Sequence, residues 1–161
     1  MNEPVWLALA RLDTGLRELP GAPTAPKIAA WLADLGAWWR DDETPWCGTA
    51  VAAWMKKAGF QLPKHWYRAK GWLDWGVRLE VPAVGAVVVF ERAGGGHVGL
   101  VVGKDLAGRL LVLGGNQGNQ VCIAAFDMGR VVGYRWPASP KPVLAALPTY
   151  SGGAALSRDE A

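Results

Sequence analysis

Hydrophobic residues recur at helical spacing through the first half of the chain. In residues 5–19, and again in residues 27–40, apolar side chains fall three or four positions apart, which is typical of amphipathic helices. Residues 20–26 between them are rich in proline and predict a loop. The same spacing returns in residues 44–59, so a third helix is expected there.

The second half of the chain changes to the short apolar runs of β-strands. Glycine-rich turns separate these runs, which predicts about five short antiparallel strands. The runs cover residues 85–91, 97–103, 109–113, 121–126 and 131–136. Helices followed by strands predict an α+β domain, in which N-terminal helices pack on a mostly antiparallel sheet.

Residues 1–137 are expected to form one domain. A chain of 161 residues is long enough to bury a core within a single domain. After residue 137 the sequence is mostly proline, alanine, serine and glycine without a clear period. Residues 138–161 are therefore predicted to be a flexible C-terminal tail.

Composition narrows the classes of function. The apolar fraction of 51% and the charged fraction of 19% are those of a globular protein. The net charge of +3 is too small to indicate nucleic acid as a partner. No apolar stretch approaches the roughly 20 residues that span a bilayer, and the first residues lack the basic region of a signal peptide. We expect a monomer that is made in the cytoplasm without membrane insertion.

Cys47 is the first candidate for chemistry, because it lies in the first turn of the helix predicted over residues 44–59. Thr44 is expected to cap that helix, and Pro45 suits its first helical position. The positive end of the helix dipole favours the thiolate, the reactive form of cysteine. The alternative is that Cys47 simply fills space in the core, as most cysteines do.

His97 and Asn116 are expected to meet Cys47 at one edge of the sheet. His97 opens a strand after a glycine turn, and Asn116 ends the following strand, so antiparallel pairing would bring them together. A thiol nucleophile, an imidazole base and an amide that orients the imidazole are the parts of a cysteine hydrolase. The alternative for Asn116 is an ordinary turn asparagine.

Two further groups of residues are considered for binding. The aromatic segment 66–75, expected to be a short helix, either lines a substrate groove or packs in the core. The acidic turn at residues 41–43 is expected to be a solvated loop, with binding of a cationic group as the alternative. Two cysteines and two histidines without close pairing do not form a standard zinc site, so no metal or other cofactor is expected.

Several motifs in a fixed order resemble the CHAP and NlpC-type papain-like cysteine hydrolases. They lie at residues 45–47, 69–76, 82–92, 97–103, 113–117 and 133–137, so the likeness covers roughly residues 5–137. The resemblance implies a papain-like fold and a peptidoglycan hydrolase that cleaves amide bonds. It carries catalytic roles to Cys47, His97 and Asn116. Many CHAP domains place a glutamate where this chain has Gly114, so Asn116 is expected to act alone or with Gln117.

We also expect a biological setting and a set of substrate-binding residues, for which core packing is the alternative role. Residues expected to contact peptidoglycan are Trp46, Trp72, Trp75 and Gln117. The expected setting is a phage endolysin that acts in the periplasm or cell wall after its release. The alternatives are a secreted antibacterial effector with an immunity protein as partner, and a non-catalytic module that binds the cell wall.

Overall fold

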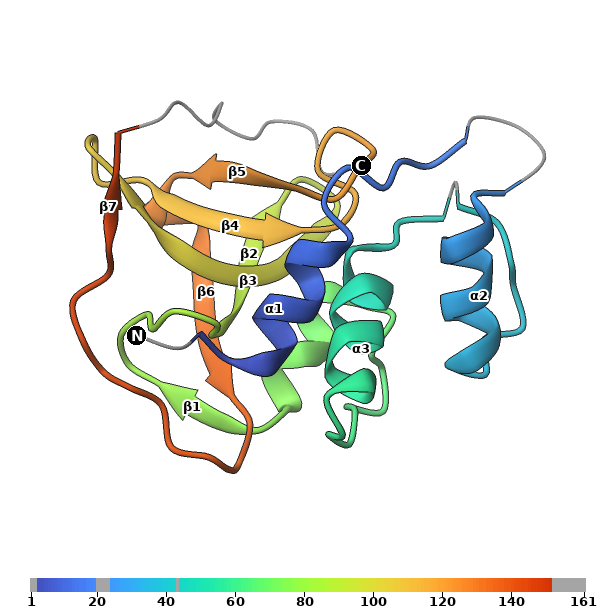
Figure 1. The fold of residues 1–161 in the computed structure, drawn as a ribbon, viewed down its shortest axis with the longest axis horizontal. Helices are drawn as coiled ribbons and strands as arrows, with labels where there is room; N and C mark the ends of the chain where they lie inside the picture. Colours follow the sequence, from blue (N-terminus) through green and yellow to red (C-terminus); the bar gives the residue numbers. More distant parts are fainter. Residues whose placement is uncertain (1–2, 20–23, 43, 152–161) are drawn as a thin grey trace.

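The computed structural model describes residues 3–19, 24–42 and 44–151 (Figure 1). Its α-helices lie in the first half of the chain, as the periodicity predicts: α1 (Val5–Leu12), α2 (Pro26–Asp34) and α3 (Cys47–Lys57). Two short 3₁₀ helices follow, η1 (Ala69–Asp74) and η2 (Met128–Arg130). Along the described residues, no helix is long and apolar enough to cross a bilayer.

Within the described residues the strands form one seven-stranded sheet of order β1-β6-β2-β3-β4-β5, with β7 beside β3. The strands are β1 (Val77–Leu79), β2 (Val87–Arg92), β3 (Gly95–Asp105), β4 (Leu110–Gly114), β5 (Cys122–Phe126), β6 (Val131–Trp136) and β7 (Thr149–Tyr150). All the pairings are antiparallel except β3 with β7. The predicted α+β class with a mostly antiparallel sheet is confirmed.

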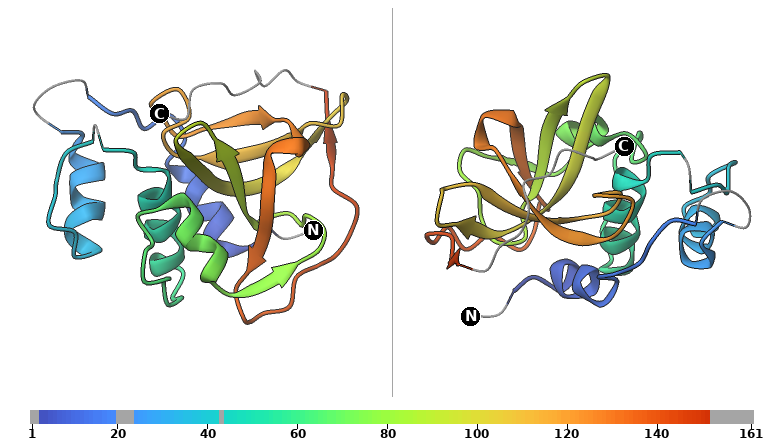
Figure 2. Two further views of the ribbon diagram at one scale, coloured as in Figure 1. Left: turned by 180° about the vertical axis from the view of Figure 1, so that it is seen from behind. Right: turned by 90° about the horizontal axis from the view of Figure 1, so that it is seen from above.

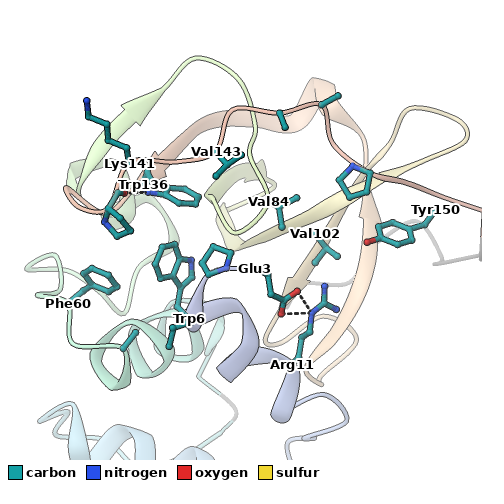
Figure 3. Close-up of a pocket in the computed structure, with 17 residues that line it drawn as sticks. Glu3, Trp6, Arg11, Phe60, Val84, Val102, Trp136, Lys141, Val143 and Tyr150 are labelled. Atoms are coloured by element: carbon teal, nitrogen blue, oxygen red, sulfur yellow. Dashed lines mark hydrogen bonds and ion pairs between the residues drawn. The ribbon is translucent and has the colours of Figure 1, made fainter. Parts of the chain in front are cut away.

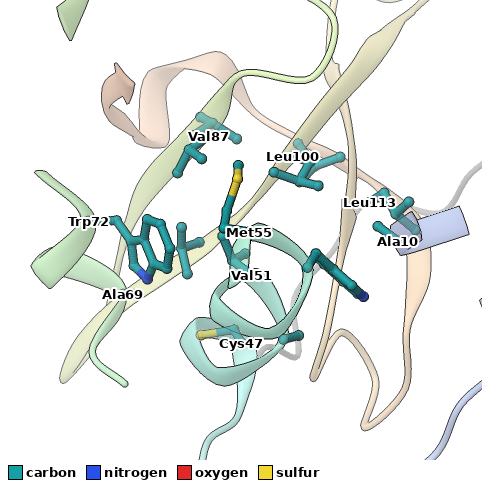
Figure 4. Close-up of a cluster of buried hydrophobic side chains, with 14 of the residues drawn as sticks. Ala10, Cys47, Val51, Met55, Ala69, Trp72, Val87, Leu100 and Leu113 are labelled. Atoms are coloured by element: carbon teal, nitrogen blue, oxygen red, sulfur yellow. The ribbon is translucent and has the colours of Figure 1, made fainter. Parts of the chain in front are cut away.

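Helices α1 and α3 lie side by side against the sheet, and α2 lies on the far side of α3 (Figures 1 and 2). Asp13, just after α1, joins all three helices: it accepts a 2.8 Å hydrogen bond from the indole of Trp54 and pairs with Lys27. On the opposite side of α3, Val51 and Met55 point toward the strands, with Met55 directed between Val87 and Leu100 (Figure 4). This apolar contact fixes α3 on the sheet.

Helix α3 begins later than the sequence predicts. Thr44 does not cap it, because its hydroxyl and backbone N–H both bond to the carboxylate of Asp41, each at 2.7 Å. The helix starts at Cys47, so Pro45 precedes the helix. The helix predicted over residues 27–40 ends at Asp34, and Gly36 follows with a left-handed φ of 77°.

The helix predicted over residues 5–19 ends at Leu12, because the chain after it bonds to the turn between β4 and β5. The N–H of Gly15 donates to Val121 O at 2.8 Å, and the N–H of Val121 donates to Leu16 O at 2.8 Å. The N–H of Glu18 donates to Asn119 O at 3.0 Å. Residues 15–18, here called the N-terminal brace, therefore hold that turn in place.

In the acidic turn at residues 41–43, Asp42 is buried and holds neighbouring backbone groups, which corrects the expectation of a solvated loop. Its carboxylate is 1% exposed and accepts hydrogen bonds from the N–H groups of Leu19 at 2.7 Å and Ala25 at 2.9 Å. Asp41 is exposed, and Glu43 lies outside the described residues, as do residues 20–23 of the predicted loop.

Residues 138–151 differ from the expected flexible tail because the sheet holds them. The indole of Trp136 donates to Pro140 O at 2.6 Å, and the N–H of Lys104 donates to Pro148 O at 2.9 Å. Strand β7 then pairs with β3. A pocket of about 670 Å³ lies between this segment and α1, with Trp6 and Trp136 in its wall (Figure 3). The rest of the predicted tail, residues 152–161, lies outside the described residues.

Candidate active site

The thiol of Cys47 lies where the first turn of α3 meets the start of β3. It is 4% exposed, and the backbone N–H groups of Val98 and Gly48 act on it. Burial raises the pKa of this thiol above its ordinary value, and these amides and the positive charge of Arg92 only partly offset the rise. The expected preference for the thiolate is therefore wrong in its net direction, and Cys47 needs a base to take its proton.

The imidazole of His97 is fully buried, and His97 directly precedes Val98, whose backbone N–H acts on the Cys47 thiol. Strand pairing places His97 opposite Phe90 of β2. The ring of Phe126 stacks on the imidazole, with centroids 5.3 Å apart and planes 11° apart. The stack fixes the plane of the imidazole. Hydrogen bonds then decide which way the ring is turned within that plane.

Gln117 contacts the imidazole. Its Oε1 lies 2.9 Å from Nε2 of His97, and its Nε2 donates to the carbonyl of Cys122 at 2.8 Å and that of Val112 at 3.3 Å. Carbonyl oxygens only accept, so this end of the amide must be the NH₂ group and the other end the acceptor. The proton therefore sits on Nε2 of His97, which leaves Nδ1 as the basic nitrogen.

Gly114 provides the space for this contact. A Cβ at Gly114 would lie 2.3 Å from Oε1 of Gln117 and 3.4 Å from Nε2 of His97. A glutamate there, which the resemblance leads one to expect, would occupy the place that the amide of Gln117 fills. The glycine and the glutamine are thus two parts of one arrangement around the imidazole.

Asn116 lies in the same turn, where it is 1% exposed and has a left-handed φ of 59°. Asparagine adopts this conformation more readily than other residues with a side chain. It turns the chain after β4, so that Gln117 reaches back toward His97. The catalytic role expected for Asn116 stays a prediction.

The expected substrate-binding residues lie inside the protein, which corrects that assignment. Trp46, Trp72 and Trp75 are 1%, 0% and 8% exposed. Each indole N–H has an internal acceptor: Glu18 Oε1 for Trp46, Trp66 O for Trp72 and Gln61 O for Trp75. Tryptophan dominates cores as well as grooves, and the sequence does not separate the two uses. Gln117 is 2% exposed, with both ends of its amide engaged internally.

Two further residues of the site, Arg92 and Phe126, were not assigned a role from the sequence. Arg92 ends β2, donates to Gly96 O at 3.0 Å and acts on the thiol of Cys47 by its charge. Phe126 lies on β5 and reaches His97 across the sheet. Arg92 ends the motif at residues 82–92, which was the available signal, whereas no local signal marks Phe126, because its contact depends on strand pairing. Both cysteines belong to the described part of the chain and are free thiols.

A thiol, an imidazole and an amide thus lie at one end of the sheet, which is the chemistry of nucleophilic acyl transfer. Among the described residues, no group of three or more His, Cys, Asp or Glu side chains is placed to hold a metal ion.

Comparison with known proteins gives one match. The family model of the CHAP domain matches residues 38–116, a stretch that includes Cys47, His97 and Asn116. No curated protein and no solved structure matches the chain.

Proposed function

We propose, from the premise that this chain belongs to the CHAP domain family, that it hydrolyses peptidoglycan amide bonds with Cys47 as nucleophile. The CHAP domain indicates a peptidoglycan hydrolase of the amidase or peptidase type. The observation that carries the assignment of residues is the 2.9 Å contact between Gln117 and His97, next to the contact of the Cys47 thiol with Val98. Together these contacts support one nucleophile and one oriented base.

In the proposed first step, sulfur of Cys47 attacks the carbonyl carbon of the amide as its proton passes to Nδ1 of His97. The oxyanion accepts hydrogen bonds from the backbone N–H groups of Cys47 and Gly48, which act on the sulfur in the resting protein and, at a helix start, have no intrahelical acceptor. His97 then gives the proton to the amide nitrogen. The C–N bond breaks, the amine leaves and a thioester to Cys47 remains.

In the second step, water attacks the thioester carbon and gives its proton to His97. The C–S bond breaks, the carboxylic acid leaves and the proton returns to sulfur. Gln117 accepts from the Nε2–H of His97 throughout and so keeps Nδ1 directed at the reacting groups. Burial raises the pKa of Cys47, and the proposal therefore gives the first step a base.

The biological setting that we propose is a phage endolysin, which acts as a monomer on the cell wall. A secreted effector with an immunity protein uses the same chemistry and is the second candidate. A wall-binding module without activity is the third, but it has no need for an oriented imidazole beside a thiol.

Clearing of outer-membrane-permeabilised cells tests the proposal. The wild type should clear the suspension, and Cys47→Ala should not. Cys122→Ser is the matched control: it should keep activity, because Gln117 bonds mainly to the backbone carbonyl of Cys122. His97→Ala should also be inactive while remaining folded. Equal clearing by Cys47→Ala would remove this thiol from the mechanism, and mass spectrometry of the released muropeptides would identify the cleaved bond.

A further inference from the structure

We infer that an aromatic cleft beside the start of α3 binds sugar rings of the glycan strand. The aromatic cleft is formed by Trp38, Trp39, Trp66 and Tyr67. It has a volume of about 490 Å³. The inference rests on the proposed function, because it assigns part of the same substrate to this cleft.

The cleft is built from rings that pack on one another and still face solvent. Trp39 stacks on Trp66, with centroids 6.0 Å apart and planes 19° apart. Tyr67 and Trp38 each contact Trp39 edge to face, at 5.6 and 5.5 Å. Trp38 is 89% exposed, which is unusual for a side chain with so much apolar surface. Exposed aromatic surface of this kind marks a binding groove.

The cleft opens at the end of α3 that carries Cys47. Thr44, three residues before Cys47, lines it. On the other side, a Cβ at Gly48 would lie 2.5 Å from the carbonyl oxygen of Trp66, so the cleft wall touches the residue after Cys47. The cleft therefore borders the start of α3, the helix turn that carries Cys47.

The chemistry of the cleft favours sugar over peptide. A pyranose ring offers a flat face of C–H groups, which matches the exposed ring of Trp38, and hydroxyls at its edge. Asp41 and Thr44, whose side chains are joined by a 2.7 Å hydrogen bond, line the same cleft and supply polar groups at the edge of the aromatic rings. Peptidoglycan stem peptides offer small and charged side chains, which match flat aromatic faces poorly.

Indole N–H signals in NMR spectra test this inference directly, with the full-length Cys47→Ala protein to prevent turnover. The probes are peptide-free glycan strands and, separately, a sugar-free stem peptide. We expect the glycan to shift the signal of Trp38, identified by its loss in Trp38→Leu. That variant should weaken glycan binding roughly three- to tenfold, whereas Trp38→Tyr should keep most of it. Leu106→Ala, at another exposed apolar residue, is the control and should bind normally.

Several results would overturn the inference. The inference fails if the glycan does not shift the Trp38 indole signal, or if the peptide alone shifts it. It also fails if Trp38→Leu binds the glycan normally. A Trp38 signal that shifts only with protein concentration would indicate a second copy of the chain in the cleft. Cell clearing by the wild type without glycan binding would refute the cleft and leave the proposed function standing. Glycan binding without any hydrolysis would refute the function and leave the cleft standing.

Discussion

The side-chain amide of Gln117 decides which nitrogen of His97 carries the proton. Its NH₂ group is fixed by two backbone carbonyls, so its oxygen can only accept from the imidazole. In Cys-His hydrolases the orienting group keeps the imidazole in one tautomer, and its loss costs turnover rather than binding. We therefore treat Gln117 as a positioning residue.

Replacing Gln117 with leucine tests this role. Gln117→Leu should lower kcat by roughly 10²-fold or more with little change in KM, because the imidazole loses the hydrogen bond that favours one tautomer. The pH dependence of Cys47 alkylation by iodoacetamide should change as well, which a purely structural defect would not produce. Asn116→Gly keeps the left-handed backbone and is the matched comparison; it should lose less activity. The reverse order of the two variants would assign the orienting role to Asn116.

Replacing Arg92 provides a second test, of the electrostatics around the Cys47 thiol. Burial raises the pKa of the Cys47 thiol, so the rate of alkylation should rise with pH as the thiolate forms. Arg92→Gln removes a positive charge that favours the thiolate, so the midpoint of that rise should move to higher pH. Alkylation is followed in the Cys122→Ser background, which leaves one thiol. A midpoint that stays in place, or moves to lower pH, would show that Arg92 does not act on Cys47.

The sequence singled out Cys47 and His97, which the fold places near one end of the sheet, but not the contacts around them. Cys47 and His97 stand out because a helix start and a glycine turn are local signals. The choice between Asn116 and Gln117 depends on how a left-handed turn redirects two adjacent side chains, which the order of residues does not reveal. The buried tryptophans were misassigned for a related reason, since burial is a property of the whole fold.

Among the structural elements, the start of α3 depends on close packing against residues 66–67. Gly48 allows this approach, because any Cβ there would meet the backbone of Trp66 and Tyr67 at 2.5 to 3.1 Å. The contact links the turn that carries Cys47 to one wall of the aromatic cleft.

Gly48→Ala should therefore destabilise the protein, although alanine is the better helix former. We expect the free energy of unfolding in urea to fall by about 1–3 kcal/mol, the usual cost of overpacking. Gly95→Ala is the matched control, because a Cβ at Gly95 would meet only Arg92 at 3.9 Å; it should leave stability nearly unchanged. A Gly48→Ala protein as stable as the wild type would show that the 66–67 segment moves freely.

Periodicity predicted the longer elements and failed for the shortest. The central strands are continuous apolar runs, which are strong signals. Strand β1 has three residues and β7 has two, too few to show a period. The N-terminal brace was read as helix, because its bonds to the β4–β5 turn join residues about a hundred positions apart.

For the molecule as a whole, residues 138–151 cover one side of the sheet and of α1. Truncation after residue 137 removes β7 and the segment that faces Trp6, Val102 and Trp136. We expect the urea midpoint to fall, with a loss of about 2–4 kcal/mol for the apolar surface that becomes exposed. An unchanged midpoint would support the boundary at residue 137 that composition predicts.

The N-terminal brace gives the fold a consequence for protein engineering. The turn that carries Gln117 is anchored by residues 15–18, and neither the brace nor Gln117 lies within the stretch that matches the family model. A chimera assembled from residues 38–116 alone would keep Cys47 and His97. It would lose Gln117, which orients the imidazole, and the N-terminal brace. Portable versions of this domain should therefore retain residues 15–18, although these residues lie far along the chain from the candidate site.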